Sequence, residues 1–219
     1  MITGIILAAG NGLRFGKKKQ FTLIQKNNYL FEFSLKKIID TGICKKIILV
    51  IPPKTDIKII KYCKNKYPEI DLVEGGDNRV HSIRNAVLHI KNSHENSFIL
   101  LIDSSRPIIN TKIIKELIRR SIKEDTNYVL IKKITDFLVS NKKEKLSYVD
   151  RNKYFLTHTP HVYKFKDIYK ILKKEKKYPE IDTSMIMSNQ KINISSLEIF
   201  YSDIKITYKE DLEIFLREL

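Results

Sequence analysis

Short apolar runs alternate along the chain with stretches in which apolar residues recur every three or four positions. The continuous apolar runs are typical of strands buried on both faces, and they fall at 1–7, 46–51, 71–74, 98–102 and 128–132. Helical spacing is found between them, over 29–40, 55–66, 79–90 and 111–123. This alternation predicts a Rossmann-like, mostly parallel sheet sandwiched by helices, with ligands beyond the carboxyl ends of the strands.

The alternation breaks after residue 132. Residues 134–140 and 146–151 predict a β-hairpin with a charged turn over 141–145. An isolated hairpin is marginally stable in water, so we expect a partner to cover this protruding arm, residues 134–151. The pattern resumes with a helix, three short strands and a closing helix, over 165–173, 191–194, 197–201, 204–207 and 209–216.

Composition narrows the class of protein. A chain of 219 residues with 42% hydrophobic content suits one α/β domain, and we expect a single domain over 1–219. No apolar run reaches the roughly 18 residues of a membrane span, which predicts a cytoplasmic protein with no membrane partner. Cys44 and Cys63 lack ligand spacing, which argues against a zinc site and a disulfide framework.

The net charge of +16 and the pI of about 9.6 are compatible with nucleic-acid binding. However, the lysines are scattered, and no aromatic-flanked basic stripe accompanies them. An A+T-biased coding sequence would give the same abundance of lysine, isoleucine and asparagine. We therefore expect no nucleic-acid partner.

A glycine-rich loop follows the first predicted strand, with the sequence Ala8-Ala9-Gly10-Asn11-Gly12-Leu13-Arg14-Phe15-Gly16. Bare backbone N–H groups in such a turn form an anion-binding concavity, and Arg14 and Lys19 add positive charge. The glycine spacing matches neither a P-loop nor Gly-x-Gly-x-x-Gly. The loop therefore predicts a polyphosphate site of another type.

A second glycine segment, Gly75-Gly76-Asp77-Asn78-Arg79-Val80-His81-Ser82, follows a predicted strand and opens a helix. Paired glycines let the backbone approach a planar base, and Asp77, Ser82 and the helix N-terminus offer hydrogen-bonding groups. The alternative is a plain turn in which Asp77 or Asn78 caps the helix.

Asp103 stands where the fourth apolar run, 98–102, ends, and Arg106 and Pro107 follow it. A carboxylate there can help to hold Mg²⁺, which takes one or two carboxylates plus phosphate oxygens, or it can bind substrate hydroxyl groups. The alternative is a strand-end turn stabilised by an Asp–Arg pair.

These three segments, together with Asp150-Arg151-Asn152, Thr157-His158-Thr159-Pro160-His161 and Asp203-Ile204-Lys205-Ile206-Thr207, occur in the order found in one enzyme family. The chain resembles the 2-C-methyl-D-erythritol 4-phosphate cytidylyltransferases and their ribitol-5-phosphate cytidylyltransferase relatives, from Ile5 to about Leu212. The resemblance implies the nucleotide-diphospho-sugar transferase type of fold. It also implies CMP transfer from CTP to 2-C-methyl-D-erythritol 4-phosphate in isoprenoid precursor synthesis, with release of pyrophosphate.

The resemblance also implies roles for single residues. It implies that Arg14, Lys19, Arg151 and Lys205 are catalytic, the first two on the triphosphate and the others on the acceptor phosphate. The residues implied to bind nucleotide are Ala8, Ala9, Gly10, Gly12, Gly75, Gly76, Asp77 and Ser82. Those implied to bind the acceptor are Asp103, Arg106, Arg151, Thr159 and Lys205. The cofactor would be Mg²⁺, with Asp103 as its ligand, and the arm would join two subunits of a homodimer.

Several positions depart from the family pattern, namely Lys18, Ser104, Ser105, Phe137 and Asp203. Phe137 lies near a position where the family often has an acceptor-binding threonine, so ribitol 5-phosphate or another polyol phosphate for surface polysaccharide is an alternative acceptor. The segment Asp150-Arg151-Asn152 favours the methylerythritol substrate. A basic nucleic-acid-binding relative without activity is the alternative of another class.

Overall fold

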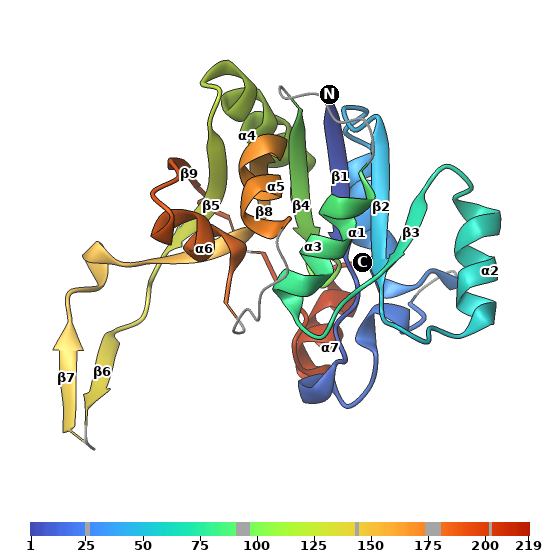
Figure 1. Ribbon diagram of the computed structural model, residues 1–219. Helices are drawn as coiled ribbons and strands as arrows, with labels where there is room; N and C mark the ends of the chain where they lie inside the picture. The colour runs from blue at the N-terminus through green and yellow to red at the C-terminus, as the bar shows by residue number, and fades with distance from the viewer. Residues whose placement is uncertain (25–26, 91–96, 143–144, 174–180, 202) are drawn as a thin grey trace.

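A sheet of seven strands forms the centre of the protein in the computed structural model (Figure 1). The structure describes residues 1–24, 27–90, 97–142, 145–173, 181–201 and 203–219. The strand order is β3-β2-β1-β4-β8-β5-β9. The strands are β1 Ile2–Leu7, β2 Lys46–Ile51, β3 Asp71–Glu74, β4 Phe98–Asp103, β5 Asn127–Lys133, β8 Phe155–Lys164 and β9 Ile194–Glu198.

Most neighbouring strands run parallel. β1 pairs in parallel with β2 and β4, β2 with β3, and β5 with β9, whereas β8 runs antiparallel to both β4 and β5. The predicted fold class, a mostly parallel α/β sheet, is therefore confirmed.

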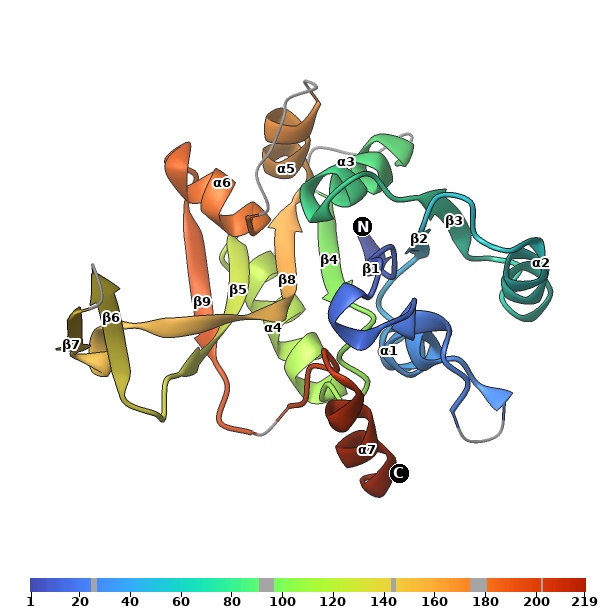
Figure 2. The same cartoon turned by 90° about the horizontal axis from the view of Figure 1, so that it is seen from below.

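Helices cover both faces of this sheet (Figures 1 and 2). Alternation along β1 places Ile6 and Ile5 on opposite faces, where each belongs to a separate apolar cluster. Buried residues of α1, α2 and α4 join the cluster around Ile6, and those of α3, α5 and α6 join the cluster around Ile5. The helices are α1 Leu30–Ile39, α2 Ile57–Lys66, α3 Arg79–His89, α4 Thr111–Lys123, α5 Phe165–Leu172, α6 Thr183–Asn189 and α7 Lys209–Arg217.

A third apolar cluster lies below the carboxyl ends of the strands, where Phe215 of α7 packs with Phe15 and Ile206. It anchors the glycine-rich loop and the segment around Ile206 to the body of the protein. No helix among the described residues has the length and apolar character needed to cross a membrane.

The predicted hairpin forms a separate two-stranded sheet, β6 Leu138–Lys142 and β7 Lys145–Val149, which projects away from the body (Figures 1 and 2). The predicted turn was too long, because residues 141, 142 and 145 belong to the strands; residues 143–144 lie outside the described residues. Large apolar side chains on the arm are exposed: Phe137 is 82% exposed and Tyr148 is 81% exposed.

Some predicted elements were wrong. The two strands expected over 191–194 and 197–201 are one strand, β9. Residues 204–207 are not a strand: Ile206 N–H donates to the Ser105 carbonyl (2.9 Å), but no ladder forms. Two regular elements were missed, β8 and α6. β8 carries polar residues that line a cavity instead of a regular apolar pattern, and Asp182, which precedes α6 as its N-cap, lines the same cavity.

Candidate active site

The glycine-rich loop between β1 and α1 is held closed by its own backbone. Gly12 has φ 66°, and its carbonyl accepts hydrogen bonds from Phe15 N–H (3.0 Å) and Gly16 N–H (2.9 Å). A Cβ atom on Gly12 would lie 1.8 Å from the Lys17 carbonyl oxygen, so only glycine fits. Gln20 Nε2 donates to the Gly10 carbonyl (3.0 Å) and ties the loop from the other side. This loop forms one wall of a cavity of about 440 Å³.

We refer to this cavity as the nucleotide cavity, after the predicted nucleotide-binding residues that line it. Its opposite wall comes from the second glycine segment. Ser82 Oγ accepts a hydrogen bond from Gly76 N–H (3.1 Å) and donates to the Asn78 carbonyl (2.9 Å). Asn78 caps α3 by accepting from His81 N–H (2.9 Å). The structural alternative considered for this segment is therefore present at Asn78, and it shapes the wall that Gly76, Asp77 and Ser82 present to the cavity.

Six of the eight predicted nucleotide-binding residues line this cavity: Ala9, Gly10, Gly12, Gly76, Asp77 and Ser82. Ala8 and Gly75 do not. Ala8 is 2% exposed and lies in the core. A Cβ atom on Gly75 would lie 2.4 Å from Ala9 Cβ, so Gly75 allows the two walls to approach each other.

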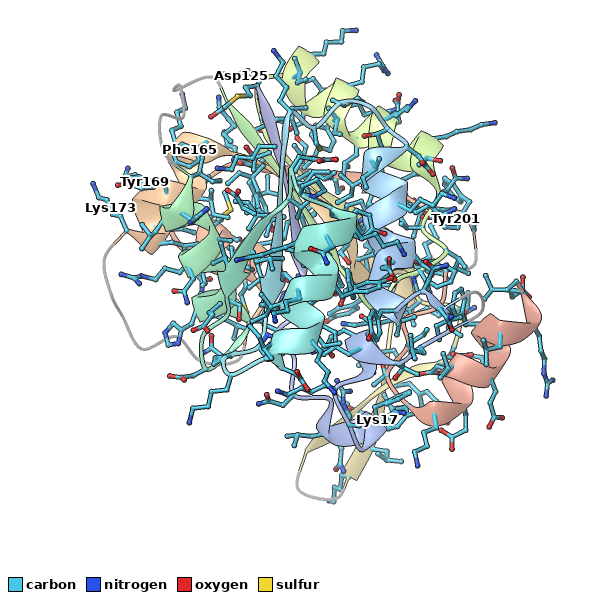
Figure 3. The ribbon with its side chains drawn as sticks, turned by 90° about the vertical axis from the view of Figure 1, so that its right-hand side faces the viewer. Lys17, Asp125, Phe165, Tyr169, Lys173 and Tyr201 are labelled. Carbon is cyan, nitrogen blue, oxygen red and sulfur yellow. The ribbon has the colours of Figure 1, made fainter. Side chains whose placement is uncertain are left out.

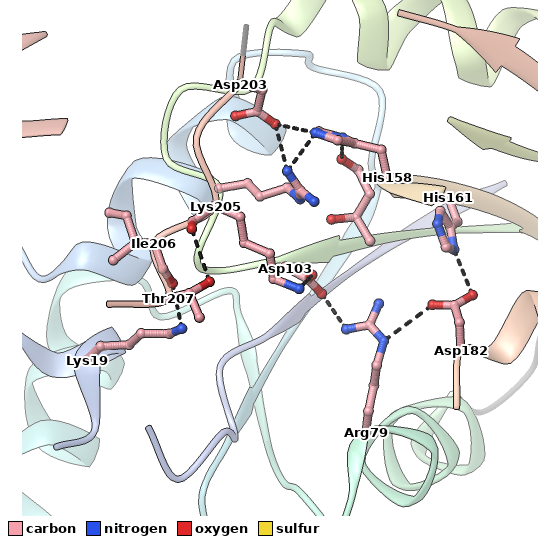
Figure 4. Close-up of polar contacts among 12 residues, drawn as sticks. Lys19, Arg79, Asp103, His158, His161, Asp182, Asp203, Lys205, Ile206 and Thr207 are labelled. Atoms are coloured by element: carbon pink, nitrogen blue, oxygen red, sulfur yellow. Dashed lines mark hydrogen bonds and ion pairs between the residues drawn. The ribbon is translucent and has the colours of Figure 1, made fainter. Parts of the chain in front are cut away.

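Three cations face the same cavity. Arg14, Lys19 and Lys205 all line it, and Lys19 Nζ donates to the Ile206 carbonyl at 2.5 Å (Figure 4). Burial, with Lys205 and Arg14 close by, lowers the pKa of Lys19 to about 8. Cations that repel one another in this way favour an anion between them, and a triphosphate supplies that charge.

Asp103 lies at the end of β4 and lines both this cavity and a second one of about 210 Å³. Arg79 donates to its carboxylate, and Lys205 Nζ lies 3.5 Å from Oδ2. Although burial opposes ionisation, Arg79 and Lys205 hold the pKa of Asp103 well below its usual range. The carboxylate is therefore charged at neutral pH.

The second cavity adjoins the first, because Arg79, Asp103 and Lys205 line both. Four of the five predicted acceptor-binding residues line it: Asp103, Arg106, Thr159 and Lys205. We refer to it as the acceptor cavity. Its remaining wall is formed by Arg79, Thr157, His161, Ile181 and Asp182.

The Arg106 side chain is held by partners within the protein. Its Nη1 lies 2.6 Å from His158 Nε2 and 3.2 Å from Asp203 Oδ2, and His158 Nε2 is 3.1 Å from that same oxygen (Figure 4). Burial and Arg106 lower the pKa of His158 to about 4, and burial raises the pKa of Asp203 to about 6. Neutral His158 therefore accepts from Arg106, which fixes the arginine at the cavity wall.

Arg151 lies outside both cavities of its own chain. It donates to the Thr135 carbonyl at the foot of the arm, and its guanidinium carbon lies 5.2 Å from the centre of the Phe137 ring. The prediction that it serves a neighbouring subunit stays a prediction.

The side chains that could act as ligands limit how Mg²⁺ can bind at this site. The described residues contain no group of three or more histidine, cysteine, aspartate or glutamate side chains that could hold a metal. Asp103 is the single carboxylate that lines both cavities, and both of its oxygens face cations. The site therefore fits an ion that takes most of its ligands from phosphate oxygens and water.

Five wall residues were not predicted as site residues: Arg79, Thr157, His161, Ile181 and Asp182. Arg79 belongs to the second glycine segment that carries the family resemblance, but it was given no role of its own. Asp182 caps α6 by accepting from Ser184 N–H (2.9 Å), and an Asp-Thr-Ser sequence at a helix start is the signal that could have located it.

Comparisons with known proteins agree on one family. A family model for IspD, 2-C-methyl-D-erythritol 4-phosphate cytidylyltransferase, matches residues 2–216. A cytidylyltransferase of that name from Clostridium beijerinckii is 32% identical over 225 residues, which cover 97% of this chain and 95% of the relative. One from Thermotoga neapolitana is 28% identical over 216 residues, with 98% and 95% covered.

Solved structures show the same fold. A 4-diphosphocytidyl-2C-methyl-D-erythritol synthase from Anaerococcus prevotii superposes with a TM-score of 0.80 at 25% identity, covering 100% of this chain and 95% of that one. The Francisella tularensis enzyme has a TM-score of 0.81 at 21% identity, covering 100% and 99%. The motif order, the paired cavities and the family match agree, and the chain belongs to the 2-C-methyl-D-erythritol 4-phosphate cytidylyltransferase family.

Proposed function

We propose that the protein transfers CMP from CTP to 2-C-methyl-D-erythritol 4-phosphate and releases pyrophosphate. One observation carries the proposal: a cavity lined by Arg14 and Lys19 adjoins a smaller polar cavity, and the two share Arg79, Asp103 and Lys205. Two phosphorylated substrates bound side by side would meet at these shared residues. The family match extends over 2–216 and supports the same reaction.

In the reaction, an oxygen of the acceptor phosphate attacks the α-phosphorus of CTP in line with the departing pyrophosphate. The acceptor phosphate is already ionised near neutral pH, so no general base is needed. Arg14 and Lys19 stabilise the negative charge that develops on the triphosphate, and the closed loop holds it in position. Lys205 lines both cavities and neutralises the acceptor phosphate as it approaches.

We propose that Mg²⁺ takes part. When bound, the ion would neutralise charge on the phosphate oxygens, and Asp103 would supply the one carboxylate near it. Arg79 and Lys205 keep that carboxylate ionised and therefore available.

We also propose that the protein is a homodimer joined by the arm. Phe137, Leu146 and Tyr148 leave the arm with an exposed apolar surface, which a second subunit would cover. Arg151 at its foot would then reach the neighbour's acceptor cavity, where a guanidinium suits a phosphate. The cytoplasmic location and the absence of a nucleic-acid partner stay predictions.

The test is pyrophosphate release from CTP and Mg²⁺ with either 2-C-methyl-D-erythritol 4-phosphate or ribitol 5-phosphate. We expect turnover with the first acceptor, a loss of at least about 100-fold in Lys19→Ala, and little change in the matched control Lys17→Ala. Lys17 is exposed on the same loop (Figure 3). It does not line the nucleotide cavity. Turnover with ribitol 5-phosphate alone would refute the proposed acceptor, and equal effects of the two lysine variants would refute the role of Lys19.

A further inference from the structure

Three buried polar atoms of the acceptor cavity residues lack a hydrogen-bond partner within the described part of the chain: Arg106 Nε, Thr159 Oγ1 and His161 Nε2. Arg106 is otherwise held by His158 and Asp203, whereas the other two atoms belong to β8 residues that are 4% and 1% exposed. Both residues line the acceptor cavity. Because most buried polar groups in folded proteins are paired, two bare atoms beside one cavity indicate a ligand that pairs with them.

The backbone brings both residues to the cavity through an irregularity in the sheet. On β8, His158 pairs with Leu130 and His161 pairs with Val129, so two residues of β8 have no counterpart on β5. Thr159 lies in this bulge and His161 directly follows it. Bulges of this kind occur next to binding sites, where they redirect side chains.

The other ring nitrogen of His161 is occupied. Nδ1 lies 2.6 Å from the Tyr163 hydroxyl and 3.8 Å from Asp182 Oδ1. Burial lowers the pKa of His161 to about 4, so the ring is neutral at neutral pH. A neutral imidazole has one donor and one acceptor nitrogen, and Nε2 is free to pair in either tautomer. A hydroxyl group can donate or accept, so it satisfies Nε2 in both.

Asp182 lies between His161 and Arg79. Ser184 Oγ donates to Asp182 Oδ1 (2.6 Å), and Asp182 Oδ2 lies 3.6 Å from Arg79 Nε. Arg79 in turn pairs with Asp103, so the contacts run from Asp103 to His161 along one side of the site (Figure 4). Lys205, which would hold the acceptor phosphate, contacts Asp103 at one end of this series of contacts, and His161 lies at the other end, where we place the carbon chain of the acceptor.

We propose that His161 Nε2, with Thr159 Oγ1 beside it, hydrogen-bonds a hydroxyl group of the acceptor and selects a polyol phosphate over an analogue that lacks this hydroxyl. The inference rests on the proposed function and names a specificity-determining side chain for it.

The experiment compares kcat/KM for 2-C-methyl-D-erythritol 4-phosphate with that for its monodeoxy analogues, one per hydroxyl group. Each ratio is measured on one enzyme sample, so any loss of folded protein cancels. The variants are His161→Leu, His161→Met as a second apolar replacement in case one does not fold, and His161→Gln, whose amide again offers a donor and an acceptor.

For the unsubstituted enzyme we expect kcat/KM to be at least about 10-fold lower with one of the analogues than with the full acceptor, since a site built to pair with a hydroxyl rejects an acceptor without it. In His161→Leu and His161→Met the ratio of kcat/KM for the full acceptor to kcat/KM for that analogue should fall to near 1. His161→Gln should retain part of the discrimination. The apparent KM for CTP should stay within about threefold in all three variants, because His161 does not line the nucleotide cavity.

Unchanged ratios for every analogue in both apolar variants would overturn the inference while leaving the proposed function standing. No turnover of the full acceptor by the unsubstituted enzyme would overturn the proposed function, and the inference would fall with it.

Discussion

Replacing Gly12 by alanine separates backbone strain from steric collision in the nucleotide loop. Gly12 and Gly16 both have positive φ, 66° and 83°, so alanine at either position costs about 1–2 kcal/mol of strain. Only Gly12 adds a collision, because its Cβ atom would lie 1.8 Å from the Lys17 carbonyl oxygen. At Gly16 the nearest atom is Lys209 Cε at 4.0 Å, an ordinary contact. Gly16→Ala is therefore the matched control.

The size of the effect follows from how far the loop must move. Real Cβ atoms essentially never lie within 3.0 Å of another atom, so the Lys17 carbonyl must shift by more than about 1 Å. Lys19 is two residues further on and would be displaced with it. A misplacement of about 1 Å can cost about 100-fold in rate, which corresponds to about 2.7 kcal/mol of transition-state stabilisation.

The assay is kcat/KM for CTP, measured together with the free energy of unfolding in urea. We expect Gly12→Ala to lose about 100-fold in kcat/KM for CTP. Gly16→Ala should lose less than about fivefold in kcat/KM, and its loss of stability should be limited to the strain of about 1–2 kcal/mol. If the two variants lose activity equally, the reasoning that the closed loop positions Lys19 is refuted.

Four further predictions follow from charge and exposure. Since the pKa of Lys19 is lowered to about 8, kcat/KM for CTP should fall as the pH rises through this value and Lys19 loses its proton. In Lys19→Arg this fall should move to higher pH. If the pH profiles of the variant and the unsubstituted enzyme were identical, Lys19 would not be the titrating group. Burial raises the pKa of Asp203 to about 6, so ionisation costs stability as pH rises from its unfolded value towards 6. The free energy of unfolding in urea of Asp203→Asn, relative to that of the unsubstituted protein, should therefore rise by about 2 kcal/mol between pH 4.5 and 7.5. A difference between the two proteins that does not change with pH would contradict this. Finally, Arg151→Ala should raise the acceptor KM at least about 10-fold with CTP binding unchanged, and Tyr148→Ser should shift the protein towards monomers in sedimentation; a variant that stays fully dimeric would argue against the arm.

Much of the fold could be predicted because its parallel strands are buried on both faces. Such strands read as uninterrupted apolar runs, and α4 was predicted over its observed bounds, Thr111–Lys123. β8 escaped prediction because one half carries polar residues that face the acceptor cavity, which hides its period. The segment around Ile206 alternates like a strand, yet it packs on α7 instead of joining the sheet.

The nucleotide loop could be predicted because glycine spacing and nearby charge are local features. The acceptor cavity could not be predicted in full, because its wall joins residues far apart in the sequence. Arg79 at the start of α3 contacts Asp182 at the start of α6. Arg106 contacts Asp203 and His158, and these three residues come from three separate segments of the chain. Pairings of this kind depend on topology and leave no trace in a short window of sequence.

The shared wall between the cavities sets limits on how such an enzyme can diverge. A substitution at Arg79, Asp103 or Lys205 alters both cavities together, so selection that acts on one cavity constrains the other. Thr157, Thr159 and His161 line the acceptor cavity alone, and all three belong to β8. Substitutions within this single strand can therefore change which polyol phosphate is accepted, while the use of CTP is preserved.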